Sequence, residues 1–220
     1  MTRPTARSAA IYPSLKGKRV LVTGGGSGIG AGIVEGFARQ DADVTFFDIA
    51  ETDSALLVER LAAAGHKVGF ERVDLTDIAA LQALIGRLIE QPGGFDILVN
   101  NAGNDDRHTI DDITEAYWDE RLSVNLKHMF FCAQAVVPAM RAKGGGAIVN
   151  LGSISWHLAL NDLVLYQTCK AAIEGLTRSL ARDLGRDGIR VTCVIPGNVR
   201  TPRQLKWYTP EGEAEIVAAQ

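Results

Sequence analysis

The sequence predicts an α/β fold, with one doubly wound parallel sheet and helices on both of its faces. Two observations predict it. From Lys18 onward, short apolar runs alternate with longer segments of helical periodicity, which is typical of parallel strands joined by helical crossovers. Glycine-rich turns separate several of these segments, as at residues 144–146, where a helix is expected to end before a strand. At 220 residues the chain has the length of one domain, and we expect a single domain over residues 1–220.

The elements of the first half follow in order. Residues 19–23 form the first expected strand, because Val20, Leu21 and Val22 are apolar and glycines follow Thr23. A helix at 29–39 opens from those glycines, and the apolar run 44–48 is the next strand. Spaced apolar residues predict helices at 53–64 and 78–89, with a strand between them at 67–73.

The second half repeats the pattern. The run 95–100 is a strand, and 113–142 carries a helical pattern long enough to be broken. A strand at 147–151, a helix at 165–184 and a strand at 190–195 follow. Right-handed crossovers place ligands at the carboxyl ends of the strands of such a sheet.

Composition excludes several classes of function. The net charge is -3 and the basic residues are dispersed among acidic ones, so no nucleic-acid surface is expected. No apolar run is long enough to span a membrane, and the first eighteen residues lack an apolar signal core, so we expect a cytoplasmic protein. The cysteines and histidines lack the spacing of metal ligands, and no metal is expected.

The sequence Thr23-Gly24-Gly25-Gly26-Ser27-Gly28-Ile29-Gly30 predicts a phosphate-binding turn. It lies between an expected strand and an expected helix, where free backbone N–H groups and the helix dipole favour a pyrophosphate. Asp48 ends the next apolar run, which is the place of the acidic residue in a dinucleotide-binding fingerprint.

Three further motifs lie at the expected carboxyl ends of strands or on the helix beyond them. Asn100-Asn101-Ala102-Gly103 and Ser153 each follow a strand, and Tyr166 and Lys170 are four residues apart, on one face of a helix. Together with the glycine turn and Pro196-Gly197, these motifs resemble the short-chain dehydrogenase/reductase family, with its Rossmann fold, over essentially the whole chain.

The resemblance implies roles for four catalytic residues. Tyr166 would be the general base, and Lys170 would lower the pKa of its phenol and hydrogen-bond the ribose. Ser153 would hold the substrate oxygen beside Tyr166. Asn125 would hold a water molecule that passes the proton outward.

The resemblance also implies a cofactor site. Gly24, Ser27, Gly28, Ile29 and Gly30 correspond to the pyrophosphate turn. Asp74 corresponds to an adenine contact. Asn101, Ala102 and Gly103 would line the adenosine side, and Val199 and Thr201 would face the nicotinamide, with Tyr166 and Lys170 also against the cofactor. Asp48 would accept hydrogen bonds from the ribose hydroxyls and repel a 2′-phosphate, and no Lys or Arg interrupts the turn, so NAD is expected rather than NADP.

Within the family, segments 10–18, 100–107, 152–157 and 206–213 are most similar to bacterial sugar 1-dehydrogenases, those acting on D-xylose first. The resemblance implies oxidation of the anomeric carbon of an aldose to an aldonolactone. L-Arabinose, D-galactose or D-glucose are alternative substrates, followed by a 3-oxoacyl or other ketone. The polar residues near the expected base fit a polyhydroxyl substrate, and the candidate contacts are Asn104, Ser153, Trp156, His157, Tyr166 and Asn198.

The C-terminal segment departs from the family pattern. Family members usually continue into a seventh strand, whereas no apolar strand follows Pro196-Gly197 here. The seventh strand is therefore expected to be missing, and a non-catalytic NAD-binding fragment stays open as an alternative. A homotetramer is the family expectation for assembly.

Overall fold

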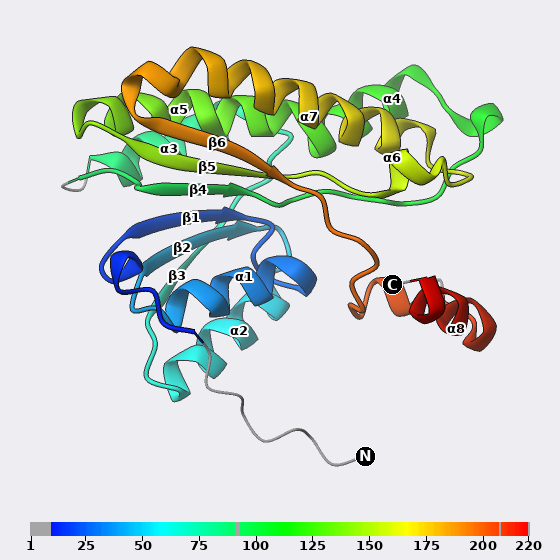
Figure 1. Ribbon diagram of the computed structural model, residues 1–220, viewed down its shortest axis with the longest axis horizontal. Helices are drawn as coiled ribbons and strands as arrows, with labels where there is room; N and C mark the ends of the chain where they lie inside the picture. The colour runs from blue at the N-terminus through cyan, green and yellow to red at the C-terminus, as the bar shows by residue number, and fades with distance from the viewer. Residues whose placement is uncertain (1–9, 91–92, 207, 220) are drawn as a thin grey trace.

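The computed structural model describes residues 10–90, 93–206 and 208–219. Its strands form one parallel sheet in the order β3-β2-β1-β4-β5-β6 (Figure 1). The order reverses between β1 and β4, which is where an open α/β sheet has its ligand crevice. The strands are β1 (Arg19–Thr23), β2 (Asp43–Asp48), β3 (Val68–Arg72), β4 (Ile97–Asn100), β5 (Gly146–Leu151) and β6 (Ile189–Val194).

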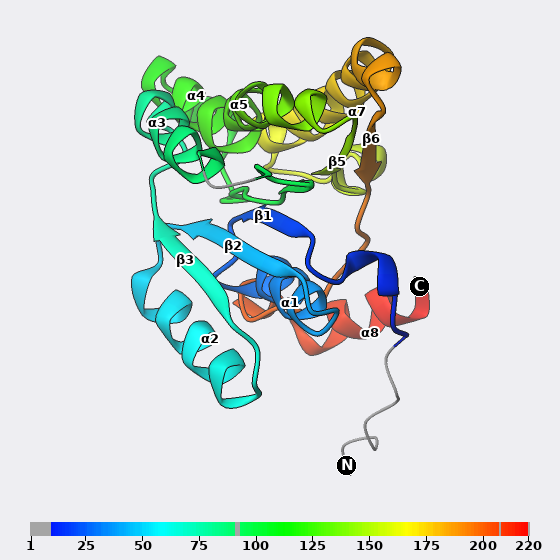
Figure 2. The same ribbon diagram turned by 90° about the vertical axis from the view of Figure 1, so that its left-hand side faces the viewer.

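Helices cover both faces of this sheet, as Figure 2 shows most directly, with α1 and α2 on one side and α3, α4, α5 and α7 on the other. The predicted doubly wound α/β fold is confirmed. The helices are α1 (Gly28–Ala38), α2 (Glu51–Ala63), α3 (Ile78–Ile89), α4 (Glu115–Leu122), α5 (His128–Ala142), α6 (Ser155–Leu158), α7 (Val164–Leu184) and α8 (Pro210–Ala219).

Alternation along the strands divides the core into two layers. Leu21 and Phe47 pack on the side of α3 and α5, whereas Val20, Val22 and Phe46 pack on the side of α1 and α2. Successive strand residues point to opposite faces, so a strand buried on both faces must be apolar throughout. This is why the central strands read as continuous apolar runs in the sequence.

The boundaries of the predicted elements are correct to within a few residues, with two differences. The helical pattern 113–142 is interrupted by the π-helical turn Ser123–Lys127 between α4 and α5, so the expected break is a local widening of the helix. The short helix α6 and the helix α8 were not predicted. Helix α6 has a single turn, and the ten residues of α8 contain several acidic side chains and a glycine, which obscure its periodicity.

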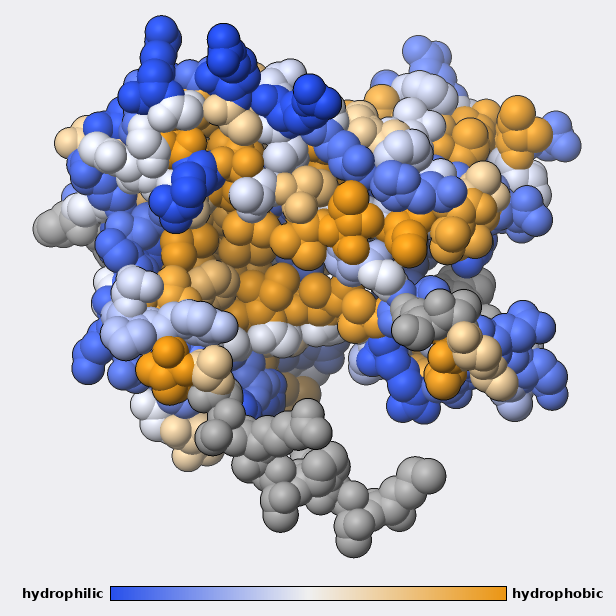
Figure 3. Space-filling view, viewed as in Figure 1, coloured by the Kyte–Doolittle hydropathy of each residue, from blue (hydrophilic) through white to orange (hydrophobic). Residues whose placement is uncertain are grey.

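Strand β6 lies at the edge of the sheet within the described residues, where it pairs with β5. Apolar side chains are exposed on this side of the molecule (Figure 3). Val194 at the end of β6 is 48% exposed, and Ile195, which follows the strand, is 41% exposed. Beyond β6 the chain leaves the sheet edge and leads to α8 (Figure 1). No helix in the described ranges has both the length and the apolarity to cross a bilayer.

Candidate active site

The glycine turn after β1 is closely packed against its own helix. Gly24 has a φ of +65°, and its amide donates to Phe47 O at 2.8 Å. A Cβ on Gly30 would lie 1.9 Å from Gly24 O, so this position admits no side chain. Ser27, which precedes α1, makes no side-chain capping bond within the described structure. The Ser27 side chain therefore does not occupy the first amides of α1, and the turn fits a pyrophosphate.

Asp48 ties the same turn to the end of β2. Its Oδ2 accepts from Gly26 N at 2.8 Å, and its Oδ1 accepts from Ala50 N at 2.9 Å. The carboxylate is thus fixed beside the turn, where the dinucleotide fingerprint places it. Asp74 lies after β3, is exposed, and accepts hydrogen bonds from the backbone amide and the hydroxyl of Thr76.

The segment after β4 is bonded to the turn through Thr23, for which the sequence predicted no role beyond its place in the glycine turn. The Thr23 hydroxyl is buried and accepts from the amides of Asn101 and Ala102 at 3.0 and 3.2 Å. In return, the Asn101 side chain donates to the carbonyls of Thr23 and Gly24 at 3.0 and 2.8 Å. Only the position of a threonine at the last residue of a buried strand signals this role.

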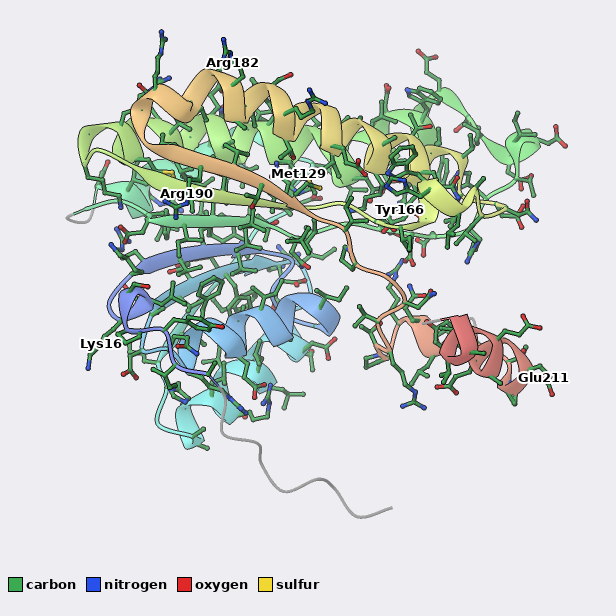
Figure 4. The ribbon with its side chains drawn as sticks, viewed as in Figure 1. Lys16, Met129, Tyr166, Arg182, Arg190 and Glu211 are labelled. Carbon is green, nitrogen blue, oxygen red and sulfur yellow. The ribbon has the colours of Figure 1, made fainter. Side chains whose placement is uncertain are left out.

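Tyr166 lies on α7 near the carboxyl ends of the strands (Figure 4). Lys170 follows four residues later, on the same face of the helix. Lys170 is 3% exposed, donates from Nζ to Leu151 O at 2.7 Å, and lies 5.3 Å from the centroid of the Tyr166 ring. Burial lowers the pKa of Lys170 to about 8. The ammonium is still charged at neutral pH.

The expected acidification of Tyr166 is not found in this state of the protein. Burial raises the pKa of Tyr166 to about 12, although a hydrogen bond from Ser153 lowers it. Desolvation is the largest cause, and the Asp105 carboxylate raises the pKa further. The Lys170 ammonium donates to Leu151 O. Ser153 follows β5, and its Oγ also lies 2.9 Å from Ser155 Oγ.

Asn125 lies in the π-helical turn and is fully buried. Its Oδ1 accepts from Asn104 N at 2.7 Å, and its Nδ2 donates to Asn104 O and Arg121 O at 3.1 and 3.0 Å. Both donors of the amide are therefore used within the chain, and the expectation that Asn125 holds a water molecule stays a prediction. A Cβ on Gly103 would lie 3.2 Å from Asn125 Oδ1 and 3.6 Å from Lys170 Nζ, so Gly103 lies close to both of these side chains.

The candidate substrate residues divide into two groups. Asn104 stays beside the catalytic cluster through Asn125. Trp156 Nε1 and His157 Nε2 instead contact Glu174 Oε1, at 2.7 and 3.1 Å, and the centroids of the two rings lie 3.8 Å apart at an interplanar angle of 34°. Trp156 Nε1 and His157 Nε2 thus already have a partner on α7, and the sugar contacts of these two residues stay a prediction. Glu174 follows Lys170 by one helical turn, and this spacing could have indicated that Glu174 lies on the same face of α7 as the catalytic pair.

The segment after β6 carries the remaining predicted residues. Asn198 and Val199 are exposed there, whereas Thr201 is partly buried. A Cβ on Gly28 would lie 3.6 Å from Thr201 Cγ2, so Thr201 reaches the glycine turn. The same segment contains Arg203, whose ion pairs with Asp105 and Asp106 were not predicted. Within the described ranges, no group of three His, Cys, Asp or Glu side chains is placed to hold a metal.

Known proteins resemble this chain over most of its length. A family model described as short chain dehydrogenase matches residues 18–212. A D-xylose 1-dehydrogenase of Caulobacter vibrioides is 63% identical over 213 residues, which cover 97% of this chain and 84% of that protein. A Rhizobium meliloti protein named "Probable galactose dehydrogenase GalD" is 46% identical over 222 residues, covering 100% of this chain and 85% of that protein.

Solved structures share the same fold. L-Sorbose reductase from Gluconobacter frateurii, complexed with NADPH and L-sorbose, superposes with a TM-score of 0.82 at 33% sequence identity. The superposition covers 87% of this chain and 73% of that chain.

Proposed function

The chain belongs to the short chain dehydrogenase family, and on that premise we propose that it oxidises the anomeric carbon of an aldose, D-xylose first, with NAD as hydride acceptor. One observation carries the proposal. The Tyr166, Lys170 and Ser153 cluster lies at the carboxyl ends of the strands, in a chain 63% identical to a D-xylose 1-dehydrogenase. The product of such an oxidation is an aldonolactone.

Proton removal from the anomeric hydroxyl is assigned to Tyr166. The Ser153 hydroxyl, which hydrogen-bonds the phenol, would hold the substrate oxygen beside it. Because burial raises the pKa of Tyr166 to about 12, a phenolate at neutral pH needs additional stabilisation. Turning the Lys170 ammonium from Leu151 O toward Tyr166 would supply part of it, because the charge lies in a desolvated site.

A bound nicotinamide supplies the hydride acceptor and, in its oxidised form, a positive charge. Residues of the turn, with Ser27, Gly28 and Ile29 at the start of α1, would hold the pyrophosphate. Asp48 favours NAD, because its charge is fixed beside the turn and would repel a 2′-phosphate. No basic residue lies between Thr23 and Gly30, and the residue after Asp48 is Ile49.

D-Galactose is the second candidate substrate, because the relative with 46% identity carries that name. A homotetramer in the cytoplasm is expected from the family resemblance. The other candidate substrates are L-arabinose and D-glucose, and the other candidate reaction is the reduction of a 3-oxoacyl or other ketone.

The test is NADH formation by the purified protein with NAD and a panel of D-xylose, D-galactose, L-arabinose, D-glucose and a simple secondary alcohol. Tyr166→Phe should abolish most turnover while NAD still binds, and Tyr12→Phe, in an exposed N-terminal position, is the matched control. Preferential turnover of D-xylose supports the proposal. Bound NAD without turnover of any sugar would leave the alternative of a non-catalytic NAD-binding protein.

A further inference from the structure

Arg203 joins two loops that border the Tyr166 site. It lies in the segment after β6, and its guanidinium donates hydrogen bonds of 2.5–2.7 Å to side-chain oxygens of three successive residues in the loop after β4, namely Asn104, Asp105 and Asp106. Gln204 adds a bond of 2.6 Å from its Nε2 to Asp105 Oδ2. Neighbouring side chains of one segment thus hold a loop far away in the sequence.

The same loop is held from its other side by the catalytic elements. Asn125 exchanges hydrogen bonds of 2.7 and 3.1 Å with the backbone N–H and C=O of Asn104. Arg121, on α4, lies 3.5 Å from Asp106 Oδ2. Asn104 therefore links Arg203, through its side chain, to Asn125, through its backbone.

The ion pair lies within electrostatic reach of the phenol. The Asp105 carboxylate raises the pKa of Tyr166, and the Arg203 guanidinium lowers it. The other titratable groups that face Tyr166 are Cys169 and Lys170. Arg203 therefore offsets a negative charge that would otherwise oppose formation of the phenolate.

The strength of the contact follows from its geometry. The Asp105 side chain is 19% exposed and that of Arg203 is 44% exposed. A single pair this exposed contributes little to stability. Here one planar guanidinium serves three acceptors, and such multiple charge-assisted bonds are the stronger kind.

We propose that Arg203 is a positioning residue, which fixes the segment after β6 to the loop after β4 and balances the Asp105 carboxylate beside Tyr166. The inference rests on the proposed function in that Tyr166 is taken as the base. Two properties of Arg203 are used separately: its planar fork holds the loop, and its charge favours the phenolate.

The test compares Arg203→Gln, Arg203→Lys and Asp105→Asn with the full-length protein. Arg200→Gln is the matched control. It removes the same charge from the same segment, but Arg200 pairs with Glu213 of α8 and not with the loop after β4. Hydrogen–deuterium exchange of the protein without cofactor measures how firmly Arg203 holds the loop after β4, a contact called the tether below. The pH dependence of kcat for sugar oxidation measures the effect of the Arg203 charge on Tyr166.

Arg203→Gln is expected to speed exchange in residues 103–107 and to move the pH profile of kcat toward alkaline pH. A move of about half a pH unit lowers kcat at neutral pH by about threefold. Asp105→Asn should move the profile toward acid pH. Arg203→Lys should restore the profile but not the slow exchange, because lysine keeps the charge and loses the fork.

Unchanged exchange in residues 103–107 of Arg203→Gln would overturn the tether. Faster exchange with an unmoved pH profile would make Arg203 a structural contact only, which also overturns the inference. A wild-type protein that oxidises no sugar overturns the proposed function instead, and the exchange comparison, made without substrate, still supports or overturns the tether.

Discussion

Replacing Gly30 by alanine tests the packing of the glycine turn directly. The new Cβ would lie 1.9 Å from Gly24 O and 2.6 Å from Asn101 Nδ2. Neither neighbour can easily move. The Gly24 amide is bonded to Phe47 O at 2.8 Å, and Gly24 O accepts from Asn101 Nδ2 at 2.8 Å. Helix α1 must therefore shift away from the turn.

The expected cost follows from two opposing effects. Overpacking a close contact destabilises a protein by about 1–3 kcal/mol. Alanine in a helix recovers up to about 1 kcal/mol relative to glycine. We expect Gly30→Ala to lower the free energy of unfolding by about 1–2 kcal/mol and to weaken NAD binding at least tenfold, because the amides of the turn are displaced.

Gly32→Ala is the matched control, because Gly32 lies on the same helix with nothing within 4 Å of its Cβ position. It should raise the free energy of unfolding by about 0.5–1 kcal/mol and leave NAD binding unchanged. Urea unfolding gives the stability of each variant, and titration calorimetry gives the dissociation constant for NAD. If Gly30→Ala proves as stable as Gly32→Ala and binds NAD equally well, the packing argument is wrong.

Three further outcomes are expected. Asp48→Asn should raise KM for NAD about tenfold or more while KM for NADP falls, in steady-state kinetics with both cofactors; parallel changes would remove Asp48 as the selector. His108 Nε2 accepts from Leu165 N at 3.2 Å at the start of α7, so His108→Ala should cost about 1–2 kcal/mol in urea unfolding and His108→Gln, which keeps an acceptor, should cost less. Burial lowers the pKa of His128 from 6.5 to about 4, so as pH falls from 6.5 to about 4 the unfolded chain binds a proton that the folded protein does not. The free energy of unfolding should drop by about 3 kcal/mol across that window, and His128→Gln should lack this component in urea titrations at each pH.

The local sequence pattern predicted the sheet, its main helices and the position of the glycine turn. Strand and helix periodicity are properties of neighbouring residues, so they can be recognised without tertiary contacts. The placement of Tyr166 and Lys170 on one face of a helix follows from the same periodicity. Asp48 at the end of β2 was likewise predictable from the order of apolar runs.

The partners of the polar side chains were not predictable in this way. Trp156 and His157 bond Glu174 on α7, although their position after Ser153 indicated the substrate pocket. Burial raises the pKa of Tyr166, and how deeply the phenol is buried depends on the packing around α7. Residue type indicated a function for these side chains, but their surroundings decided which bonds they make.

The α/β fold, the family and the residues at the carboxyl ends of the strands could be predicted from the chain alone, because each is carried by local patterns and motifs. The hydrogen bonds of Thr23 to the segment after β4, of Asn125 to Asn104, and of Arg203 to the loop after β4 could not. These bonds connect residues distant in the sequence, and their geometry exists only after the sheet has brought the loops together.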